Sequence, residues 1–280
     1  MKFSLSTNWC NRRIESGEAI AEKALSLGFD ELELGYHTTD LQAKGFLKLR
    51  DRIPVGSVHA FCPVPISAPQ GYPELYQLAS FDEEDRKMAR FQVLRNIRFA
   101  SEMGADTVVL HAGRVMCRGF FRSRTLLRRV TRGAAMVGLF KKELESLLPE
   151  LERLKVTLAL ENLPYLEGFP AEWEYVDVCG DFVKPWFDTG HDYVRLLNAW
   201  DAEGEHEKGV FRRPSLQPWG FHLTDSRGGD DHLTPGRGAV DFAALKPLAL
   251  AARHLVFEPY PDMPEDELLS GLRYLKSLWQ

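Results

Sequence analysis

The stretch VTLALE, Val156–Glu161, places a run of apolar or β-branched residues directly before a glutamate. A short run of this composition is typical of a buried strand. HLVFE, His254–Glu258, repeats the pattern near the end of the chain. A carboxylate at the end of a buried strand is costly to desolvate unless a positive charge meets it. The two stretches therefore predict buried strands whose last residues need a cationic partner.

Similar runs recur along the whole chain and predict eight strands. Between them lie segments with helical spacing of apolar residues. The predicted strands are KFSLS (2–6), ELELG (31–35), VGSVHA (55–60), DTVVLH (106–111), VTLALE (156–161), KPWFD (184–188), WGFHL (219–223) and HLVFE (254–258).

Capping residues, helix-ending glycines and stripes of apolar residues predict the helices between these strands. Gly28 is expected to end the first helix. Ser80–Glu83 is predicted to be the capping box of a helix that ends at Gly104. Apolar stripes mark core faces rather than cofactor-binding segments. The stripe residues are Ile20, Ala24 and Leu27, then Phe140, Leu144, Leu147, Leu151 and Leu154, and finally, after Pro264, Leu268, Leu272, Leu275 and Trp279.

Eight strand–helix units without a glycine-rich phosphate-binding motif favour a closed barrel over an open sheet. We predict an α/β protein with a single closed, eight-stranded parallel (β/α)8 TIM barrel, and an open doubly wound sheet is the alternative. Because no low-complexity or charged linker divides the chain, residues 1–280 are expected to form one domain. Two long connections, 60–79 and 199–218, are expected to form lids or rims.

Composition excludes several classes of protein. The charged fraction of 27% and hydrophobic fraction of 44% are ordinary for a globular protein, and no apolar run approaches the length of a membrane span. The four cysteines form no C-x-x-C pair and the N-terminal segment does not resemble a signal peptide, so we expect a cytoplasmic location. A net charge of -5 gives no support to general nucleic-acid affinity. Seven arginines between Arg114 and Arg132 are equally consistent with a solvated face and a phosphate-binding surface.

Potential metal ligands end six consecutive predicted strands. In a parallel barrel the reactive residues come from the carboxyl ends of different strands, so these side chains are expected to converge. Each alone has an ordinary structural explanation, but together they favour a divalent cation. The six are His59, His111, Glu161, Asp188, His222 and Glu258.

The last four of these residues form the predicted metal site. Glu161, Asp188, His222 and Glu258 would supply three carboxylates and one imidazole, a set that suits Mn, Mg, Co or Zn without selecting among them. Glu33 also ends a strand, but its alternation with Glu31 fits an ordinary half-exposed strand, so it is not included.

Other polar residues lie close to these ligands in the sequence. His191, in FDTGH, is placed to point into the same cavity, and Asn162 either faces away or binds substrate. The segment FHLTDSRGGDDHLTPGRG, 221–238, adds Asp225, which either supports His222 or turns the chain. Its Asp230 and His232 lie where glycines let the backbone fold back over the site.

These motifs resemble those of the xylose isomerase-like barrel superfamily. LALEN, FDTGH, FHLTD followed by D-x-H-L-x-P-G-x-G, and a terminal VFEP carry the resemblance over nearly the whole chain. The superfamily includes sugar isomerases and epimerases and also endonuclease IV, an abasic-site nuclease. The resemblance is specific for the superfamily and much less so for the reaction.

The isomerase branch implies one divalent metal, held by Glu161, Asp188, His222 and Glu258. The metal would stabilise an enediolate, while Glu161 and Glu258 would act as general base and acid on a sugar or sugar phosphate. His191 would orient substrate hydroxyls. Arg227 lies near the place of a further substrate-binding arginine, and Asn162 is a candidate substrate contact.

Endonuclease IV implies a different set, with three zinc ions and hydroxide attack on a phosphate. The chain has a counterpart for all nine zinc ligands, but it departs from the nuclease motifs at Gly190, where the nuclease has cysteine, and at Arg237, where it has glutamate. The nine are His59, His111, Glu161, Asp188, His191, His222, Asp230, His232 and Glu258.

Three functional hypotheses follow. The first is a metal-dependent sugar or sugar-phosphate isomerase or epimerase, and the second is a trinuclear zinc phosphodiesterase acting on abasic DNA. The third is a barrel that binds a sugar or phosphate ligand without turning it over, which the pair of glutamates argues against. The expected partner is a small-molecule sugar or sugar phosphate; nucleic acid is left open but not favoured, a membrane is not expected, and an oligomer is left open.

Overall fold

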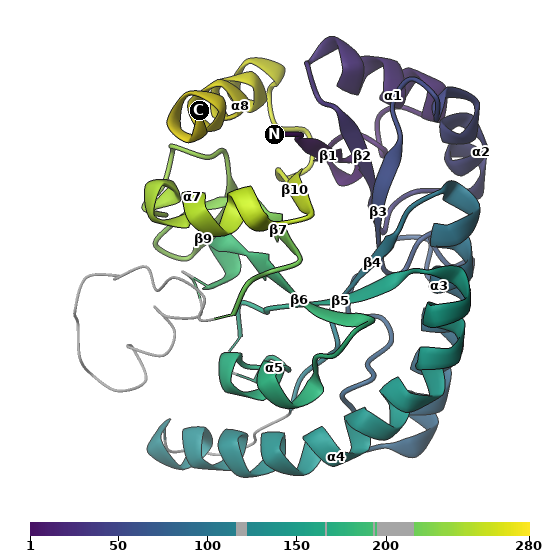
Figure 1. Ribbon diagram of the computed structural model, residues 1–280, viewed down its shortest axis with the longest axis vertical. Helices are drawn as coiled ribbons and strands as arrows, with labels where there is room; N and C mark the ends of the chain where they lie inside the picture. The colour runs from purple at the N-terminus through teal and green to yellow at the C-terminus, as the bar shows by residue number, and fades with distance from the viewer. Residues whose placement is uncertain (116–121, 166, 193, 195–215) are drawn as a thin grey trace.

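The structure, a computed structural model, describes residues 1–115, 122–165, 167–192, 194 and 216–280, without the side chains of 122–127, 230 and 231. Eight strands close a barrel in the order β1-β10-β7-β6-β5-β4-β3-β2 (Figure 1). They are β1 (Ser4–Ser6), β2 (Glu31–Leu34), β3 (Val55–His59), β4 (Thr107–Leu110), β5 (Thr157–Glu161), β6 (Val183–Asp188), β7 (Gly220–His222) and β10 (His254–Phe257).

All neighbouring strands of the barrel run parallel, including the pair that closes it, β1 and β10, in which Ser4 is opposite Val256. Seven of these strands fall within a predicted stretch and β6 begins one residue before its own, at Val183, so the predicted TIM barrel is confirmed. Because the strands are parallel, all their carboxyl ends open at one mouth of the barrel.

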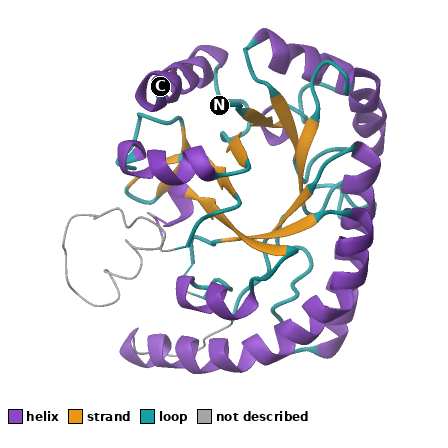
Figure 2. Cartoon of the chain, viewed as in Figure 1, coloured by secondary structure: helices purple, strands orange, loops and turns teal. Residues whose placement is uncertain are grey.

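Helices surround the ring of strands on its outer side, as Figure 2 shows. They are α1 (Gly17–Ser26), α2 (Asp40–Leu49), α3 (Glu83–Met103), α4 (Arg122–Leu154), α5 (Glu172–Val178), α7 (Phe242–Ala251) and α8 (Glu265–Trp279), and a short 3-10 helix, η1 (Thr7–Trp9), directly follows β1. Residues 60–79 connect β3 to α3 without regular structure, whereas most of the other predicted lid, 199–218, lies outside the described residues.

Of the three helix ends predicted from capping signals, at Gly28, Ser80 and Gly104, two are confirmed and one is wrong. Gly28 and Gly104 follow α1 and α3 with left-handed φ angles of 84° and 80°, as predicted. The predicted capping box at Ser80 is wrong, because Asp82 is the N-cap of α3 and its carboxylate accepts from the N–H groups of Glu84 and Asp85. Ser80 lies two residues before this N-cap, and its hydroxyl accepts from the N–H of Asp82.

Apolar residues fill both the barrel and the layer between strands and helices. The predicted stripes of α4 and α8 pack into the outer layer, where Phe140 and Leu275 are fully buried. Inside the barrel, Trp186 packs with Val109 and Val256. Gly220 makes room for this ring, because a Cβ there would lie 2.2 Å from Trp186.

The segment after β7 forms an antiparallel pair, β8 (Asp225–Arg227) and β9 (Asp230–Leu233), where the sequence had indicated only a loop. Asp225 is 1% exposed and fastens the chain that follows. Its two carboxylate oxygens accept from the backbone N–H groups of Gly236, Gly238 and Val240 at 2.9, 2.7 and 3.0 Å. Of the two roles considered for Asp225, turning the chain is the one observed.

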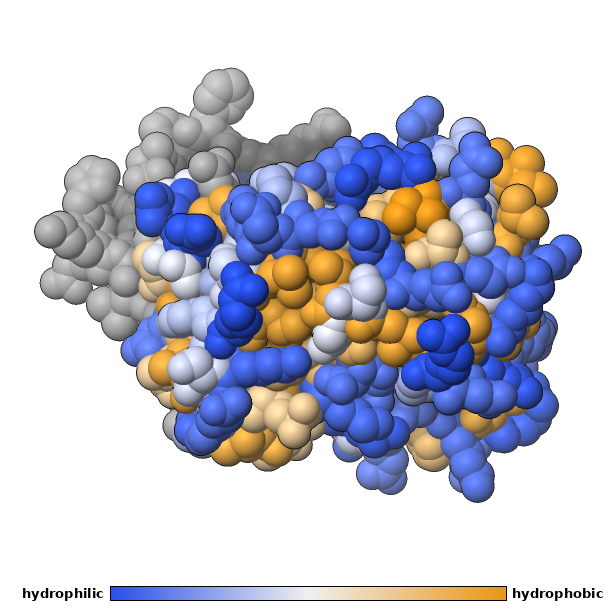
Figure 3. Space-filling view, turned by 90° about the horizontal axis from the view of Figure 1, so that it is seen from above, coloured by the Kyte–Doolittle hydropathy of each residue, from blue (hydrophilic) through white to orange (hydrophobic). Residues whose placement is uncertain are grey.

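The surface mixes charged and apolar residues. Figure 3 shows one face on which apolar patches are separated by hydrophilic side chains. Within the described part of the chain, no helix is long and apolar enough to cross a membrane.

Replacing Asp225 by alanine should destabilise the protein by about 3 kcal/mol, because several buried N–H groups lose a charged acceptor at once. Asp225→Asn keeps one acceptor oxygen and should cost less, about 1–2 kcal/mol. Urea unfolding measures both values. Asp51→Ala, at an exposed turn, is the control and should stay within about 0.5 kcal/mol of the parent. Equal stability of Asp225→Ala and the parent would contradict the role given to this carboxylate.

Candidate metal centre

Four potential ligands meet at the mouth of the barrel. Glu161, Asp188 and His222 are the last residues of β5, β6 and β7, and Glu258 directly follows β10. The first three are 0% exposed and Glu258 is 5% exposed. One ligand atom from each lies within 4.8 Å of the others. The four residues predicted as one metal site therefore lie together.

His222 is at the centre of this group, and its Nδ1 faces all three carboxylates. The distances are 3.0 Å to Oε1 of Glu161, 3.1 Å to Oε2 of Glu258 and 3.9 Å to Oδ2 of Asp188. The four-ligand group is therefore a compact cluster with its donor atoms directed at one another.

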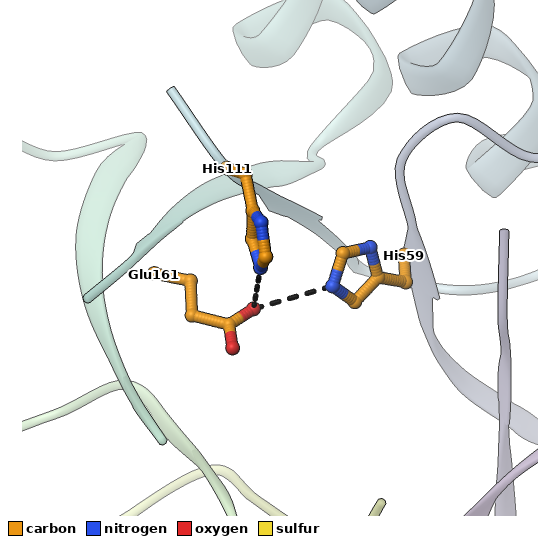
Figure 4. A group of neighbouring side chains, drawn as sticks. All are labelled: His59, His111 and Glu161. Carbon is orange, nitrogen blue, oxygen red and sulfur yellow. Dashed lines mark ion pairs between the residues drawn. The ribbon is translucent and has the colours of Figure 1, made fainter. Parts of the chain in front are cut away.

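A second group shares Glu161. The Nε2 atoms of His59, at the end of β3, and His111, directly after β4, each lie 3.2 Å from Oε2 of Glu161 (Figure 4). The ligand atoms of these three residues also lie within 4.8 Å of one another. One oxygen of Glu161 thus faces the His59–His111 pair, and the other faces His222.

Charges shift the titration of these buried groups in opposite directions. Burial alone would raise the pKa of the Glu161 carboxyl, but the charges of His222 and His111 hold it well below its ordinary value. Burial would lower the pKa of His222, yet the carboxylates of Glu161, Glu258 and Glu33 raise it well above the ordinary value. The pKa of His111 is raised to about 9, since Glu161 outweighs the effect of burial. Without a metal ion, protons on the imidazoles thus balance the carboxylates.

The hydrogen bonds of Asp188 test whether the cluster fits a cation. Its Oδ1 accepts from the hydroxyl of Thr224 and the N–H of His191, both at 2.8 Å. Among the described residues, no group donates a hydrogen bond to its buried Oδ2. Buried carboxylate oxygens are rarely left in this state. Oxygen and imidazole donors of this kind fit a divalent cation.

His191 and His232 lie at the edge of the cluster. Nδ1 of His191 donates to the carbonyl of Asn162 at 3.0 Å, and Nδ1 of His232 donates to the carbonyl of Glu258 at 3.0 Å. The two rings meet edge to face, with centroids 5.4 Å apart. Asp230, predicted to join them, is in β9, and its side chain lies outside the described residues.

The two predicted substrate contacts have different surroundings. The amide of Asn162 is paired with the backbone of Asp188, donating to its carbonyl at 3.0 Å and accepting from its N–H at 2.6 Å. Arg227 is exposed in β8, and its guanidinium donates to the carbonyl of Arg237. Asn162 thus joins two strands, and Arg227 lies at the surface.

Glu33, which was not included in the predicted site, belongs to the cluster. It is 0% exposed, and its carboxylate lies 3.1 Å from Nε2 of His222. The expectation of a half-exposed strand was wrong because both faces of β2 are covered, one by the barrel interior and the other by helices. The sequence did contain a signal for Glu33, because this carboxylate stands at the end of a predicted strand, as the predicted ligands do.

Asn8 and Glu74 are two further residues of the site that the sequence did not reveal. The amide of Asn8 donates to Oε1 of Glu258 at 3.3 Å. Glu74, within the 60–79 connection, has a carboxylate oxygen 3.8 Å from Nδ1 of His111. Neither ends a strand, so the rule that located the ligands does not find them.

The arginine-rich segment is partly accounted for. Arg114 is paired with Glu74, with its Nε 2.7 Å from the carboxylate, and Arg129 is paired with Glu174 at 2.7 Å. These two therefore serve internal ion pairs. Arg118 lies outside the described residues, as do the side chains of Arg122 and Arg124.

Solved structures of similar fold cover nearly the whole chain. A D-tagatose 3-epimerase-like protein has 20% identity and a TM-score of 0.66 over 99% of this chain and 97% of its own. D-psicose 3-epimerase from Clostridium cellulolyticum H10, solved with D-tagatose, has 15% identity and a TM-score of 0.65 over 100% of both chains. The TTHB071 protein of Thermus thermophilus, from a zinc chloride soak, has 25% identity and a TM-score of 0.59 over 99% and 98%.

A search of curated proteins finds no match to the sequence. The sequence profile of the family described as xylose isomerase-like TIM barrel, in contrast, matches residues 21–278. This match spans most of the chain and agrees with the closed parallel barrel and with the motifs at its strand ends. The chain belongs to the xylose isomerase-like TIM barrel family.

Proposed function

We propose that the protein is an isomerase or epimerase of a sugar or sugar phosphate that depends on a divalent cation. The observation that carries the proposal is the four-ligand group of Glu161, Asp188, His222 and Glu258, buried and within 4.8 Å. The sugar epimerases of similar fold support the substrate class. The ion is expected to be Mn, Zn, Co or Mg.

Two carboxylates of the group are the proposed proton-transfer residues. Glu161 and Glu258 approach Nδ1 of His222 at 3.0 and 3.1 Å from β5 and β10, which β6 and β7 separate in the barrel. Such a pair can take a proton from a carbon beside a carbonyl and return one, as general base and acid. A bound divalent ion supplies Lewis-acid stabilisation of the negative charge that develops on the substrate.

Other residues of the mouth would orient and enclose the sugar. Because Nδ1 of His191 donates to a backbone carbonyl, a ring with a single proton would offer Nε2 as an acceptor for a sugar hydroxyl. Trp186 and the apolar barrel interior lie beneath the cluster and exclude water from below. That Arg227 and Asn162 contact the substrate stays a prediction.

A second candidate is a phosphodiesterase with more than one metal ion, acting on abasic DNA. The observation that favours it is the group of His59, His111 and Glu161, which adds a second set of ligands sharing one carboxylate with the first. Clusters of ions suit phosphodiester hydrolysis because they stabilise both the attacking and the leaving oxygen. The third ion implied by the nuclease resemblance would require Asp230 together with His191 and His232.

The isomerase proposal predicts deuterium exchange. With one of the four metals and a panel of ketoses and aldoses in D2O, the protein should introduce deuterium at the carbon beside the carbonyl, as NMR would detect. Glu161→Gln and Glu258→Gln should each lower the rate by about 100-fold or more, because each loses a general base. Glu152→Gln, on the outer helix α4, is the control. Failure of every sugar to take up deuterium would contradict the proposal.

Metal binding should release protons and tighten as the pH rises. The pKa of His222, the imidazole of the four-ligand group, is well above its ordinary value, so this ring is protonated at neutral pH in the metal-free protein. A cation and a proton compete for the same nitrogen, hence affinity should rise between about pH 6 and pH 9. Calorimetry in buffers of different ionisation enthalpy measures the protons released. Affinity independent of pH over this range would be inconsistent with these ligands.

The number of ions separates the two candidates. The isomerase should contain one tightly bound ion per chain by elemental analysis and should not incise DNA that contains an abasic site. Glu258→Gln should lower the ion content, whereas His59→Ala should leave it near the parental value. Three ions per chain together with incision of abasic DNA would overturn the isomerase in favour of the phosphodiesterase.

A further inference from the structure

Glu33 lies beneath the four-ligand group rather than in it. It comes from β2, which supplies none of the four ligands, and it is fully buried. Its two oxygens lie 3.1 and 3.2 Å from Nε2 of His222. A buried carboxylate is costly without a charged or hydrogen-bonded partner, and this one has its partner at the centre of the site.

The strand pairing brings a second partner to Glu33. Along β2 and β3, Leu32 is opposite Val55 but Glu33 is opposite Ser57, so one residue of β3 is skipped. An irregularity of this kind re-aims the side chains beside it. The hydroxyl of Ser57 donates to Oε2 of Glu33 at 2.9 Å. The carboxylate is thus fixed from one side by Ser57 and directed at His222 on the other.

The contacts of the His222 ring assign its two nitrogens. Nε2 lies 3.1 and 3.2 Å from the two oxygens of Glu33, which can only accept, so a ring that gives up one proton to a cation keeps the other on Nε2. Nδ1 faces the other carboxylates, at 3.0 Å from Glu161 and 3.1 Å from Glu258. A metal ion needs a nitrogen lone pair, and with the proton held on Nε2 the lone pair available to the ion is that of Nδ1.

Two aromatic neighbours hold the plane of the same ring. His59 stacks on His222 with an interplanar angle of 6° and centroids 5.6 Å apart. Trp186 meets it edge to face, with centroids 5.0 Å apart and an angle of 70°. These rings limit the tilt of the imidazole, but they do not determine which nitrogen faces the ligands. That choice rests on Glu33.

We infer that Glu33 is a positioning residue, which holds His222 with its proton on Nε2 and its Nδ1 directed at the ligand group and so strengthens binding of a divalent cation. The inference rests on the cation site of the proposed function. A carboxylate that accepts from a ligand imidazole raises the basicity of the opposite nitrogen, and it also adds negative charge near the ion.

Co²⁺ binding to the purified full chain tests this role. Glu33→Gln preserves the size of the side chain and an acceptor oxygen but removes the charge, and it should weaken Co²⁺ binding by about 10- to 100-fold in competition with a chelator. The visible absorption of bound Co²⁺ should also shift, since the donor strength of His222 changes. A purely structural role would not move this spectrum.

Glu31→Gln is the matched control. Glu31 is two residues earlier on the same strand, and its carboxylate is paired with Lys2 at 2.9 Å, away from His222. It should bind Co²⁺ with the parental affinity and spectrum. Thermal unfolding of the metal-free variants shows whether each one folds.

Ser57→Ala provides a second variant should Glu33→Gln fail to fold. It removes one hydrogen bond from Glu33 and leaves the charge in place, so a smaller loss of affinity, about threefold, is expected. Parental affinity and spectrum in folded Glu33→Gln, or in Ser57→Ala where only that variant folds, would overturn the role of Glu33 and leave the proposed function intact. If the parental protein binds no Co²⁺, Zn²⁺, Mn²⁺ or Mg²⁺, the proposed function fails, and the role of Glu33 fails with it.

Discussion

Four carboxylates lie out of water at the mouth of this barrel, and the rest of the site is arranged to balance them. Glu33, Glu161, Asp188 and Glu258 all approach His222 within 4 Å. Such a concentration of buried negative charge is stable only with protons or a cation among the groups. The carboxylates raise the pKa of His222, and the charge of His222 lowers the pKa of Glu161. In the metal-free state the imidazoles therefore hold the protons.

The barrel makes this arrangement possible because its parallel strands deliver side chains to one point from all sides. Beneath the cluster, Trp186 packs with Val109, Ala159 and Val256, so the charged groups lie directly above apolar side chains. Around it, Asn8 and Thr224 each donate to a carboxylate and fix its orientation. Preorganised donors of this kind leave the remaining oxygens directed inward, where Asp188 Oδ2 has no donor among the described residues.

The shared carboxylate of Glu161 explains why one ligand set is compatible with two chemistries. One of its oxygens faces His222 and the other faces His59 and His111. With a single ion, the histidine pair is free to bind substrate or to tune Glu161. With further ions, as in the second candidate function, the same residues would be ligands. Fold likeness does not choose between these states, since members of one fold carry different reactions.

The sequence by itself determined the strands, the closed barrel and the residue types at the strand ends. Short apolar runs followed by His, Asp or Glu were sufficient, because parallel strands must end on the same side. Helix ends were located nearly as well, although Asp82 rather than Ser80 caps α3, since both are good caps and only the backbone path selects one.

Tertiary structure alone decided what each polar side chain does. Alternation along β2 assigns Glu33 to a face but does not reveal that His222, 189 residues away, lies opposite it. The roles of two other residues were equally hidden. Asn162 pairs with the backbone of Asp188, and the carboxylate of Asp225 accepts from the backbone N–H of Gly238. The partners of these groups come from other strands and loops. Such contacts form only when the barrel closes, so the order of residues in the sequence does not reveal them.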